Sequence, residues 1–270
     1  MTVRIAVQLH PQHASWEALR ETAVTAEEMG PDLLYTWDHF YPLYGDPDGE
    51  HFECWTLLAA WAEVTSTIEI GPLVSCNSYR NPQLLADMAR TVDHISGGRL
   101  VFGIGSGWFQ RDYDEYGFTF GTARSRLETL EEALPAIKAR WSRLNPPPVR
   151  RPPILIGGGG EQITLRLAAQ HADVWHYFPD DPEEMAHKSK VLDEWCETVG
   201  RDPVEVERSA GVHAENVAVD LALADRYHEL GVRQFTLGFT GPDYDLSPVG
   251  DWLEWRDQVN RSPSRNISRS

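Results

Sequence analysis

Short apolar runs alternate with amphipathic runs from one end of the chain to the other. The apolar runs predict strands near residues 3–9, 32–37, 68–75, 100–105, 154–157, 173–176, 207–212 and 233–238. Between them, apolar residues recur at helical spacing, most clearly over residues 16–29, 85–95 and 127–141. Eight strand-and-helix units predict a closed (β/α)8 TIM barrel of the α/β class. An open, doubly wound sheet is the structural alternative.

Punctuating residues mark where these elements begin and end. Gly30 is placed to stop the first helix, and Asn81 followed by Pro82 is placed to start another. Pro135 lies inside a helical pattern and predicts a kink or a break there. The proline-rich segment 145–153 predicts an extended connector. The polar tail 261–270 has no apolar period and is predicted to be disordered, which leaves one domain over residues 1–260.

The charge balance narrows the classes of partner. The 270 residues include 24 basic and 41 acidic side chains, for a net charge of −17. This excess of acid opposes binding to nucleic acid or to an anionic membrane surface. No window approaches the roughly 20 continuous apolar residues that a membrane span needs, and the N-terminus lacks a secretory pattern. Three widely spaced cysteines predict neither disulfides nor a zinc site. These features are typical of a cytoplasmic protein with a small-molecule substrate.

Several catalytic classes lack their key residues. The only lysines are Lys138, Lys188 and Lys190, all in helical patterns, so no lysine stands at a strand end for a Schiff base or a carbamylated metal ligand. His10 and His13 do not have the His-x-His spacing of barrel hydrolases, and no other histidines complete a metal set. No Gly-x-Ser-x-Gly elbow is present. We therefore predict no metal site, and a metal-dependent hydrolase is kept only as a rival hypothesis.

The segment Trp37-Asp38-His39-Phe40 follows the second predicted strand directly. In a barrel of alternating strands and helices, the C-terminal ends of the strands carry the chemistry. An acid, an imidazole and two aromatic rings at that edge suit the binding of a flat ring and the movement of a proton beside it. The alternative interpretation of an Asp-His pair is an ordinary hydrogen bond within a loop.

Two glycine clusters follow later strands. Gly103-Ile-Gly105-Ser106-Gly107-Trp108 closes the fourth strand, where it either approaches a ligand or forms a tight turn. Gly157 to Gly160 lie between a buried strand and a helix predicted to start near Gln162. Consecutive glycine amides at a helix N-terminus can bind phosphate without any side chain. We expect Gly158 and Gly159 to present their amides to such a group.

Six ordered motifs together resemble the luciferase-like monooxygenase superfamily, and in particular its branch that uses the deazaflavin coenzyme F420. The motifs are Trp37–Phe40, Gly71–Val74, Arg80–Pro82, Asp93–Leu100, Gly105–Trp108 and the glycines 157–160. The resemblance covers roughly residues 1–212 and returns at 231–237. It implies a flavin-type barrel whose ring lies at the C-terminal mouth, against a non-proline cis peptide at Leu73–Val74. It also suggests a homodimer.

The resemblance assigns roles to particular residues. His39 is the expected proton donor or acceptor, with Asp38 orienting it or bonding the ring. The expected coenzyme contacts are Asp38, Leu73, Val74, Ser75, Gly105, Ser106, Gly107, Gly157, Gly158, Gly159, Gly160 and Glu161. Trp37, Tyr79 and Trp108 are expected to wall the substrate pocket.

This chain also departs from the pattern of the superfamily. Trp108 stands where the sugar-phosphate dehydrogenases of the superfamily carry a catalytic glutamate. Gln162 and Ile163 replace the basic residues that many relatives place after the glycines, which leaves Arg166 as the nearest cation. The segment between the seventh and eighth strands is expected to be shortened.

Three functions follow from these observations. The first is hydride exchange between F420 and a small organic substrate. The second is an FMN-dependent monooxygenase on the same fold. The third is a non-catalytic barrel that binds a flavin or has lost its site.

Overall fold

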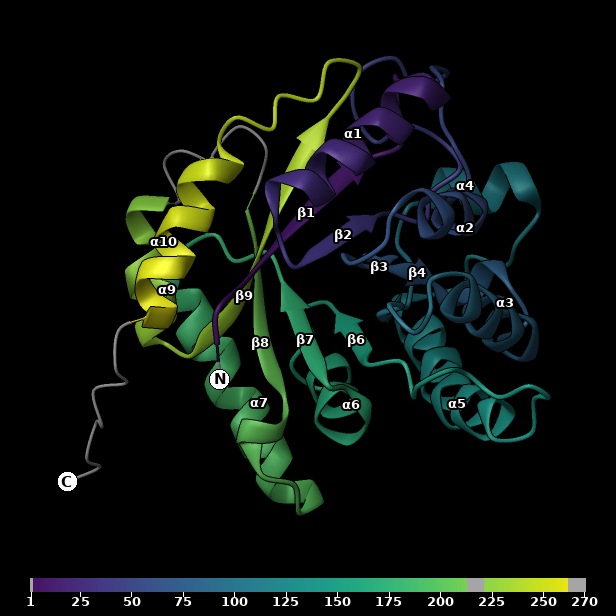
Figure 1. Ribbon diagram of the computed structural model, residues 1–270. Coiled ribbons are helices and arrows are strands. Elements are labelled where there is room, and N and C mark those ends of the chain that lie inside the picture. Colours follow the sequence, from purple (N-terminus) through teal and green to yellow (C-terminus); the bar gives the residue numbers. More distant parts are fainter. Residues whose placement is uncertain (1, 213–220, 262–270) are drawn as a thin grey trace.

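The computed structural model describes residues 2–212 and 221–261, and within them nine parallel strands form one sheet. The strands are β1 (Arg4–His10), β2 (Leu33–Thr36), β3 (Glu69–Pro72), β4 (Ser75–Cys76), β5 (Phe102–Gly105), β6 (Ile154–Gly157), β7 (Val174–Tyr177), β8 (Glu207–Val212) and β9 (Val232–Thr240). Their order is β3-β2-β1-β9-β8-β7-β6-β5-β4 (Figure 1). Each predicted strand is confirmed.

The third predicted strand is split into β3 and β4 by a cis peptide bond at Leu73–Val74. The bond lies where the resemblance places it. β4 pairs with β5, and the amide of Val101 donates to the carbonyl of Ile70 at 2.8 Å. These contacts join the two edges of the sheet into a nearly closed barrel. The predicted barrel is therefore confirmed, and the open sheet is wrong.

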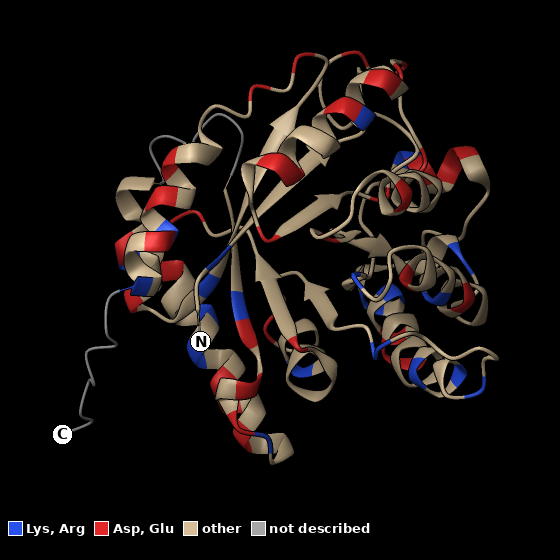
Figure 2. Cartoon of the chain, in the orientation of Figure 1, with Lys and Arg blue, Asp and Glu red and all other residues tan. Residues whose placement is uncertain are grey.

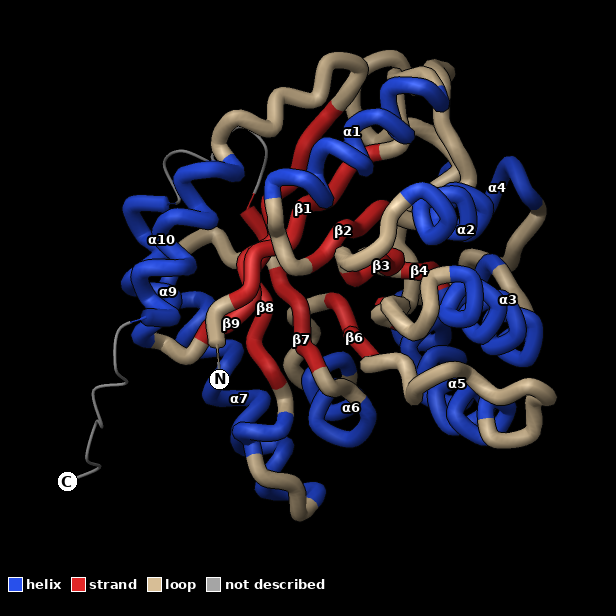
Figure 3. Tube along the Cα trace, viewed as in Figure 1, coloured by secondary structure: helices blue, strands red, loops and turns tan. Residues whose placement is uncertain are grey.

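Helices cover the outside of the barrel, as Figures 1 and 3 show. They are α1 (Trp16–Met29), α2 (Cys54–Val64), α3 (Pro82–Ile95), α4 (Gln110–Tyr116), α5 (Ala123–Trp141), α6 (Thr164–His171), α7 (Pro182–Val199), α9 (Ala224–Glu229) and α10 (Val249–Arg261). Short 3₁₀ turns are η1 (Asn77–Tyr79), η2 (Pro203–Glu205) and η4 (Leu221–Leu223).

The predicted helix boundaries are largely confirmed. Gly30 ends α1 in the left-handed conformation, with φ of 95°, and Asn81 caps α3 through its side chain. Pro135, by contrast, lies within one uninterrupted helix, so the alternative of a break is wrong. Leu134 and Ile137 on the same helix are buried against the barrel. This packing outweighs the loss of one backbone hydrogen bond.

The interior of the barrel contains a small apolar cluster, and glycines lie near the C-terminal ends of the strands around it. Val74, the residue after the cis bond, points into this space. A Cβ atom on Gly105 would lie 2.7 Å from Val74 Cγ2, and one on Gly157 would lie 3.1 Å from Val74 Cγ1. These inward glycines therefore leave the room that the Val74 side chain occupies.

We expect Gly103→Ala to destabilise the fold by about 1–3 kcal/mol, since its Cβ would lie 2.0 Å from the backbone oxygen of Pro72. The matched control is Gly250→Ala in α10, where a Cβ meets no atom within 4 Å. Alanine favours a helix over glycine, so the control should be neutral or stabilising. Denaturant unfolding measures both. Equal midpoints for the two variants would show that Gly103 is not crowded.

The described helices include none that is both long and apolar enough to cross a membrane. Acidic side chains are distributed over the outer helices and over the loop between β9 and α10 (Figure 2). Between β8 and β9, the described part of the connection consists of η4 and α9 alone. The predicted disordered tail falls on residues 262–270, apart from its first residue in α10, and these lie outside the described residues.

Candidate functional site

A cavity of about 800 Å³ opens at the C-terminal ends of the strands. Ligand pockets commonly measure roughly 300–1,000 Å³. The predicted site residues that line this cavity are Trp37, Asp38, His39, Leu73, Val74, Gly105, Ser106, Gly107, Trp108, Gly157 and Gly158. The predicted site residues that are not part of its wall are Ser75, Tyr79, Gly159, Gly160 and Glu161.

His39 is held by a buried carboxylate from another loop. Its Nδ1 lies 2.7 Å from Oδ2 of Asp112, which is fully buried at the start of α4. A carboxylate can only accept, so Nδ1–H donates and Nε2 is left as the reactive nitrogen. Asp112 Oδ1 also accepts the amide of Phe40 at 3.1 Å. The imidazole therefore has a fixed orientation and tautomer, as in other His–carboxylate pairs.

Asp112 was not predicted, and the role expected for Asp38 in orienting His39 belongs to Asp112 instead. No sequence signal marks Asp112, because it is one of several acids on a short polar helix, 73 positions from His39. Tyr79 also needs correction. Its hydroxyl donates to Asp112 at 2.9 Å, so this ring supports the carboxylate from behind and does not wall the cavity.

Asp38 is the centre of a buried ion pair. Its two oxygens accept from Arg80 at 2.6 and 3.0 Å, and Oδ2 also accepts from the hydroxyl of Ser75 and the amide of Cys76. The residue is 1% exposed. Ser75 is fully buried and accepts from Trp55 Nε1, so it lies beneath the cavity wall. These contacts fix the segment after the cis bond to the loop that carries His39.

The tetraglycine differs from a simple amide nest. The amide of Gly158, expected to face a phosphate, donates to the carbonyl of His176 at 3.0 Å. Gly158 needs glycine because its φ is +121°. Gly159 lies close to the ring of Tyr177, and a Cβ atom on it would come within 2.4 Å of that ring. Within the described residues, the amides of Gly159 and Gly160 make no hydrogen bond.

The charged residues beside these glycines are engaged elsewhere. Glu161 binds Lys188 at 2.7 Å and His187 at 3.0 Å on the outer surface. Arg166 forms a two-pronged pair with Glu131, so it is already neutralised. Helix α6 begins at Thr164, two residues later than predicted, and Thr164 lines the cavity.

Aromatic rings close the side of the cavity that carries His39. Trp37 is nearly buried and stacks on His10 with ring centres 4.1 Å apart. Its Nε1 donates to His51 at 3.0 Å, and burial lowers the pKa of His51 to about 4. Trp108 stands at the rim, 63% exposed, with its ring edge toward His39. Because His51 is neutral throughout the physiological range, its ring nitrogen can accept the bond from Trp37 Nε1.

Among the described residues, no group of three or more His, Cys, Asp or Glu side chains is arranged to hold a metal ion. The cavity instead combines a hydrogen-bonded imidazole, aromatic walls and exposed glycine backbone. These features suit a ligand that has an organic ring and a polar tail attached to it.

A nearly closed parallel barrel with a cavity at the C-terminal ends of its strands is typical of TIM-barrel enzymes, whose active sites lie at that end. The chain belongs to the luciferase-like monooxygenase family, whose family model matches residues 1–263. It is therefore an oxidoreductase, the enzyme class to which monooxygenases also belong.

Three proteins illustrate the neighbourhood. The F420-dependent hydroxymycolic acid dehydrogenase of Mycobacterium tuberculosis is 27% identical over 228 residues, which cover 78% of this chain and 62% of that protein. The pyrimidine monooxygenase of Klebsiella pneumoniae is 28% identical over 187 residues, which cover 62% of this chain and 48% of that protein. The structure of an F420-dependent secondary alcohol dehydrogenase with an F420-acetone adduct superposes with a TM-score of 0.82 at 17% identity, covering 94% of this chain and 98% of that one.

Proposed function

We propose that this enzyme exchanges a hydride between coenzyme F420 and a small organic substrate. The observation that carries the proposal is the His39–Asp112 pair, which leaves the imidazole with one nitrogen that has no hydrogen bond within the described residues, at the wall of a cavity of ligand size. The F420-dependent relatives support the choice of coenzyme.

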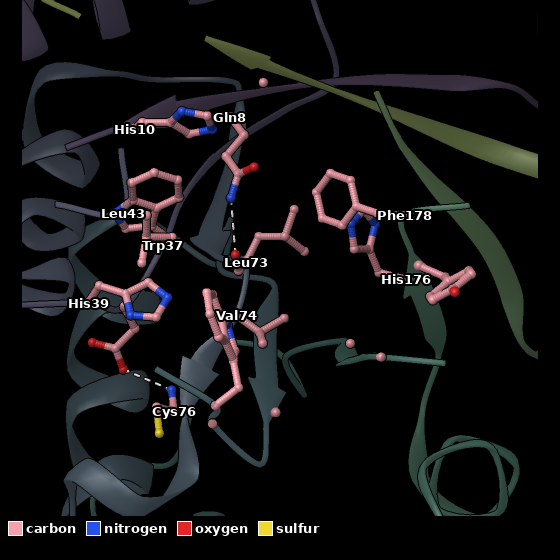
Figure 4. A pocket seen from close by; sticks show the side chains of 18 of the residues that line it. Gln8, His10, Trp37, His39, Leu43, Leu73, Val74, Cys76, His176 and Phe178 are labelled. Atoms are coloured by element: carbon pink, nitrogen blue, oxygen red, sulfur yellow. Dashed lines mark hydrogen bonds between the residues drawn. The ribbon is translucent and has the colours of Figure 1, made fainter. Parts of the chain in front are cut away.

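The residues of the cavity fit a flavin-type coenzyme. Leu73 and Val74 form an apolar face in the middle of the cavity, between His39 on one side and His176 on the other (Figure 4). A flat ring can lie against this face. Gly105, Ser106 and Gly107 line the cavity, where their backbone groups can bond the polar tail of the coenzyme. Gly159 and Gly160 follow the cavity-lining Gly158 in the chain, and their amides make no hydrogen bond within the described residues, so they are the donors that we propose for a phosphate. No cation is required there, because backbone amides alone bind anions.

F420, when bound, supplies the two-electron hydride chemistry. The residues of the chain supply orientation and the proton. Asp112 holds Nδ1 of His39, so Nε2 can take a proton from a substrate hydroxyl or return one to a substrate oxygen. Trp37 and Trp108 pack against the His39 ring and would limit the access of water to it. Asp38 contributes by fixing the His39 loop through Arg80.

The second candidate is an FMN-dependent monooxygenase, which the pyrimidine monooxygenase relative and the name of the family favour. The fold and the imidazole pair serve either coenzyme. The two coenzymes absorb at different wavelengths, so they can be distinguished directly.

We expect the purified protein to bind F420 at micromolar concentrations and at least about tenfold more tightly than FMN. Tenfold corresponds to about 1.4 kcal/mol, the scale of one or two hydrogen bonds. Fluorescence titration with F420, FMN, FAD and riboflavin measures this, and tighter binding of FMN than of riboflavin would support a phosphate contact. Preference for FMN together with oxygen consumption would establish the second candidate. Failure to bind any of the four would favour the non-catalytic barrel.

Three further properties belong to the same proposal. We place the enzyme in the cytoplasm, since Cys54, Cys76 and Cys196 are free and buried, as suits a reducing compartment. We propose a single catalytic domain over residues 1–260. We also propose a homodimer, on the strength of the family resemblance.

A further inference from the structure

His176 lies across the cavity from His39, and one of its ring nitrogens has no partner in the described parts of the chain. It belongs to β7, is 3% exposed and lines the cavity. Its Nε2 is buried and makes no hydrogen bond to any described residue. Figure 4 shows His39 and His176 on opposite sides, with Leu73 and Val74 between them. A buried polar atom without a partner destabilises a fold, so this nitrogen is expected to serve a ligand.

The other ring nitrogen, Nδ1, ends a chain of hydrogen bonds through the barrel interior. Nδ1 lies 2.8 Å from the hydroxyl oxygen of Ser209 in β8. That oxygen accepts from Nε2 of Gln234 in β9 at 3.0 Å. The carbonyl oxygen of Gln234 accepts from Arg4 in β1 at 3.1 Å. Ser209 and Gln234 are fully buried, so water does not compete for these bonds.

Arg4 gives this chain its direction. A guanidinium has only donors, so the carbonyl oxygen of Gln234 must face Arg4 and its NH₂ group must face Ser209. The Ser209 oxygen accepts that bond, and among the described residues the only acceptor within reach of its own hydrogen is Nδ1 of His176. Nδ1 is thus the acceptor, and the proton of the neutral ring resides on Nε2. Arg4 is itself held by Glu69 and Glu207 at 3.1 and 2.7 Å.

Burial keeps this imidazole neutral. It lowers the pKa of His176 to about 3, well below the physiological range. The edge contact with Phe178, at 4.9 Å between ring centres, contributes to that apolar environment. His176 can therefore donate a hydrogen bond but does not supply a proton in catalysis. His39 has the opposite arrangement, because its Nδ1 donates and its Nε2 accepts.

We propose that Nε2–H of His176 donates a hydrogen bond to a carbonyl oxygen of the coenzyme ring, and that the chain Arg4–Gln234–Ser209 fixes the proton on that nitrogen. The inference rests on the proposed function, and it adds a residue that anchors one edge of the ring. Both F420 and FMN carry carbonyl oxygens on one edge of their ring. His176 pairs in register with Gly157, which packs against Val74, so the donor stands beside the apolar face that would support the ring.

The tautomer can be tested without any coenzyme. Nitrogen NMR of the protein labelled at histidine, assigned by comparison with His176→Gln, should show His176 protonated at Nε2. Its signals should be the same at pH 7 and pH 5. In Ser209→Ala the donor to Nδ1 is lost, so a share of the Nδ1–H tautomer should appear. A wild-type ring protonated at Nδ1, or one that becomes cationic between pH 7 and pH 5, would overturn the inference.

Coenzyme titration tests the contact itself. His176→Leu removes the donor and should weaken F420 or FMN binding by about 3–10-fold, as expected for one neutral hydrogen bond. His176→Gln is the matched control, because its amide nitrogen reaches a similar position to Nε2 and should restore most of the affinity. Ser209→Ala should show a smaller loss and carries the test if His176→Leu does not fold. Unchanged affinity in folded His176→Leu, or equal losses in the Leu and Gln variants, would contradict the contact.

The two levels of the proposal fail differently. If the wild-type protein binds neither coenzyme, the proposed function is wrong, while the NMR result on His176 still holds or fails by itself. If the wild type binds and the His176 variants bind equally well, only the anchoring role is lost.

Discussion

His39→Ala is expected to lower kcat by about 10²-fold or more, the range for loss of a general acid or base. The imidazole lies on the cavity wall with Nε2 free, and Asp112 fixes its other nitrogen. Coenzyme affinity should change little, because the apolar face and the glycines remain. Single-turnover kinetics and coenzyme titration separate the two effects.

Asp112→Asn tests the same mechanism from the second residue. An amide in place of the carboxylate can leave His39 in the wrong tautomer or the wrong orientation, so kcat should fall by roughly 10-fold or more. The matched control for His39→Ala is His187→Ala. His187 is an exposed histidine on the outer surface, so its replacement should leave turnover unchanged. If both His39→Ala and Asp112→Asn turn over normally, the pair is structural and the proposed mechanism is wrong.

Asp38→Ala is expected to destabilise the fold by about 3–5 kcal/mol, because the buried Arg80 guanidinium loses its bidentate partner and, among the described residues, retains only Glu53 as a carboxylate partner. The carboxylate side chain has no exposed surface, and that of Arg80 is 9% exposed. The free energy of unfolding from denaturant titration measures the loss. Cofactor binding should weaken as well, since Asp38 fixes the loop of His39.

An exposed ion pair provides the comparison for this stability effect. Asp48→Ala removes the carboxylate partner of Arg111, but the Asp48 side chain is 77% exposed, so solvent screens this pair and its loss should change the stability far less. A double variant, Asp38→Ala with Arg80→Met, should recover part of the loss by removing a buried guanidinium that Glu53 alone would otherwise have to balance. If Asp38→Ala were no more harmful than Asp48→Ala, the Asp38–Arg80 pair would not be holding the two loops together.

Local patterns in the sequence determined most of the architecture. The alternation of apolar and amphipathic runs predicted each strand, and Gly30 and Asn81 fixed helix ends, because propensity, capping and burial act over a few residues. The ordered motifs of the resemblance located the cis bond at Leu73–Val74. They also predicted a site at the mouth of the barrel, where the structure has its cavity, since glycines and aromatic residues follow the strand ends.

Only the tertiary structure decided which side chains meet. Closing the barrel brings Asp112 to His39 and Arg80 to Asp38. It also brings together three residues from different strands, Arg4 of β1, Ser209 of β8 and Gln234 of β9. In our proposal these residues fix the proton on His176. None of these pairings leaves a short-range pattern, because the partners lie between 25 and 230 positions apart in the sequence. Hydrogen bonds depend on separations in space of a few ångströms, and in this protein the closure of the barrel sets those separations.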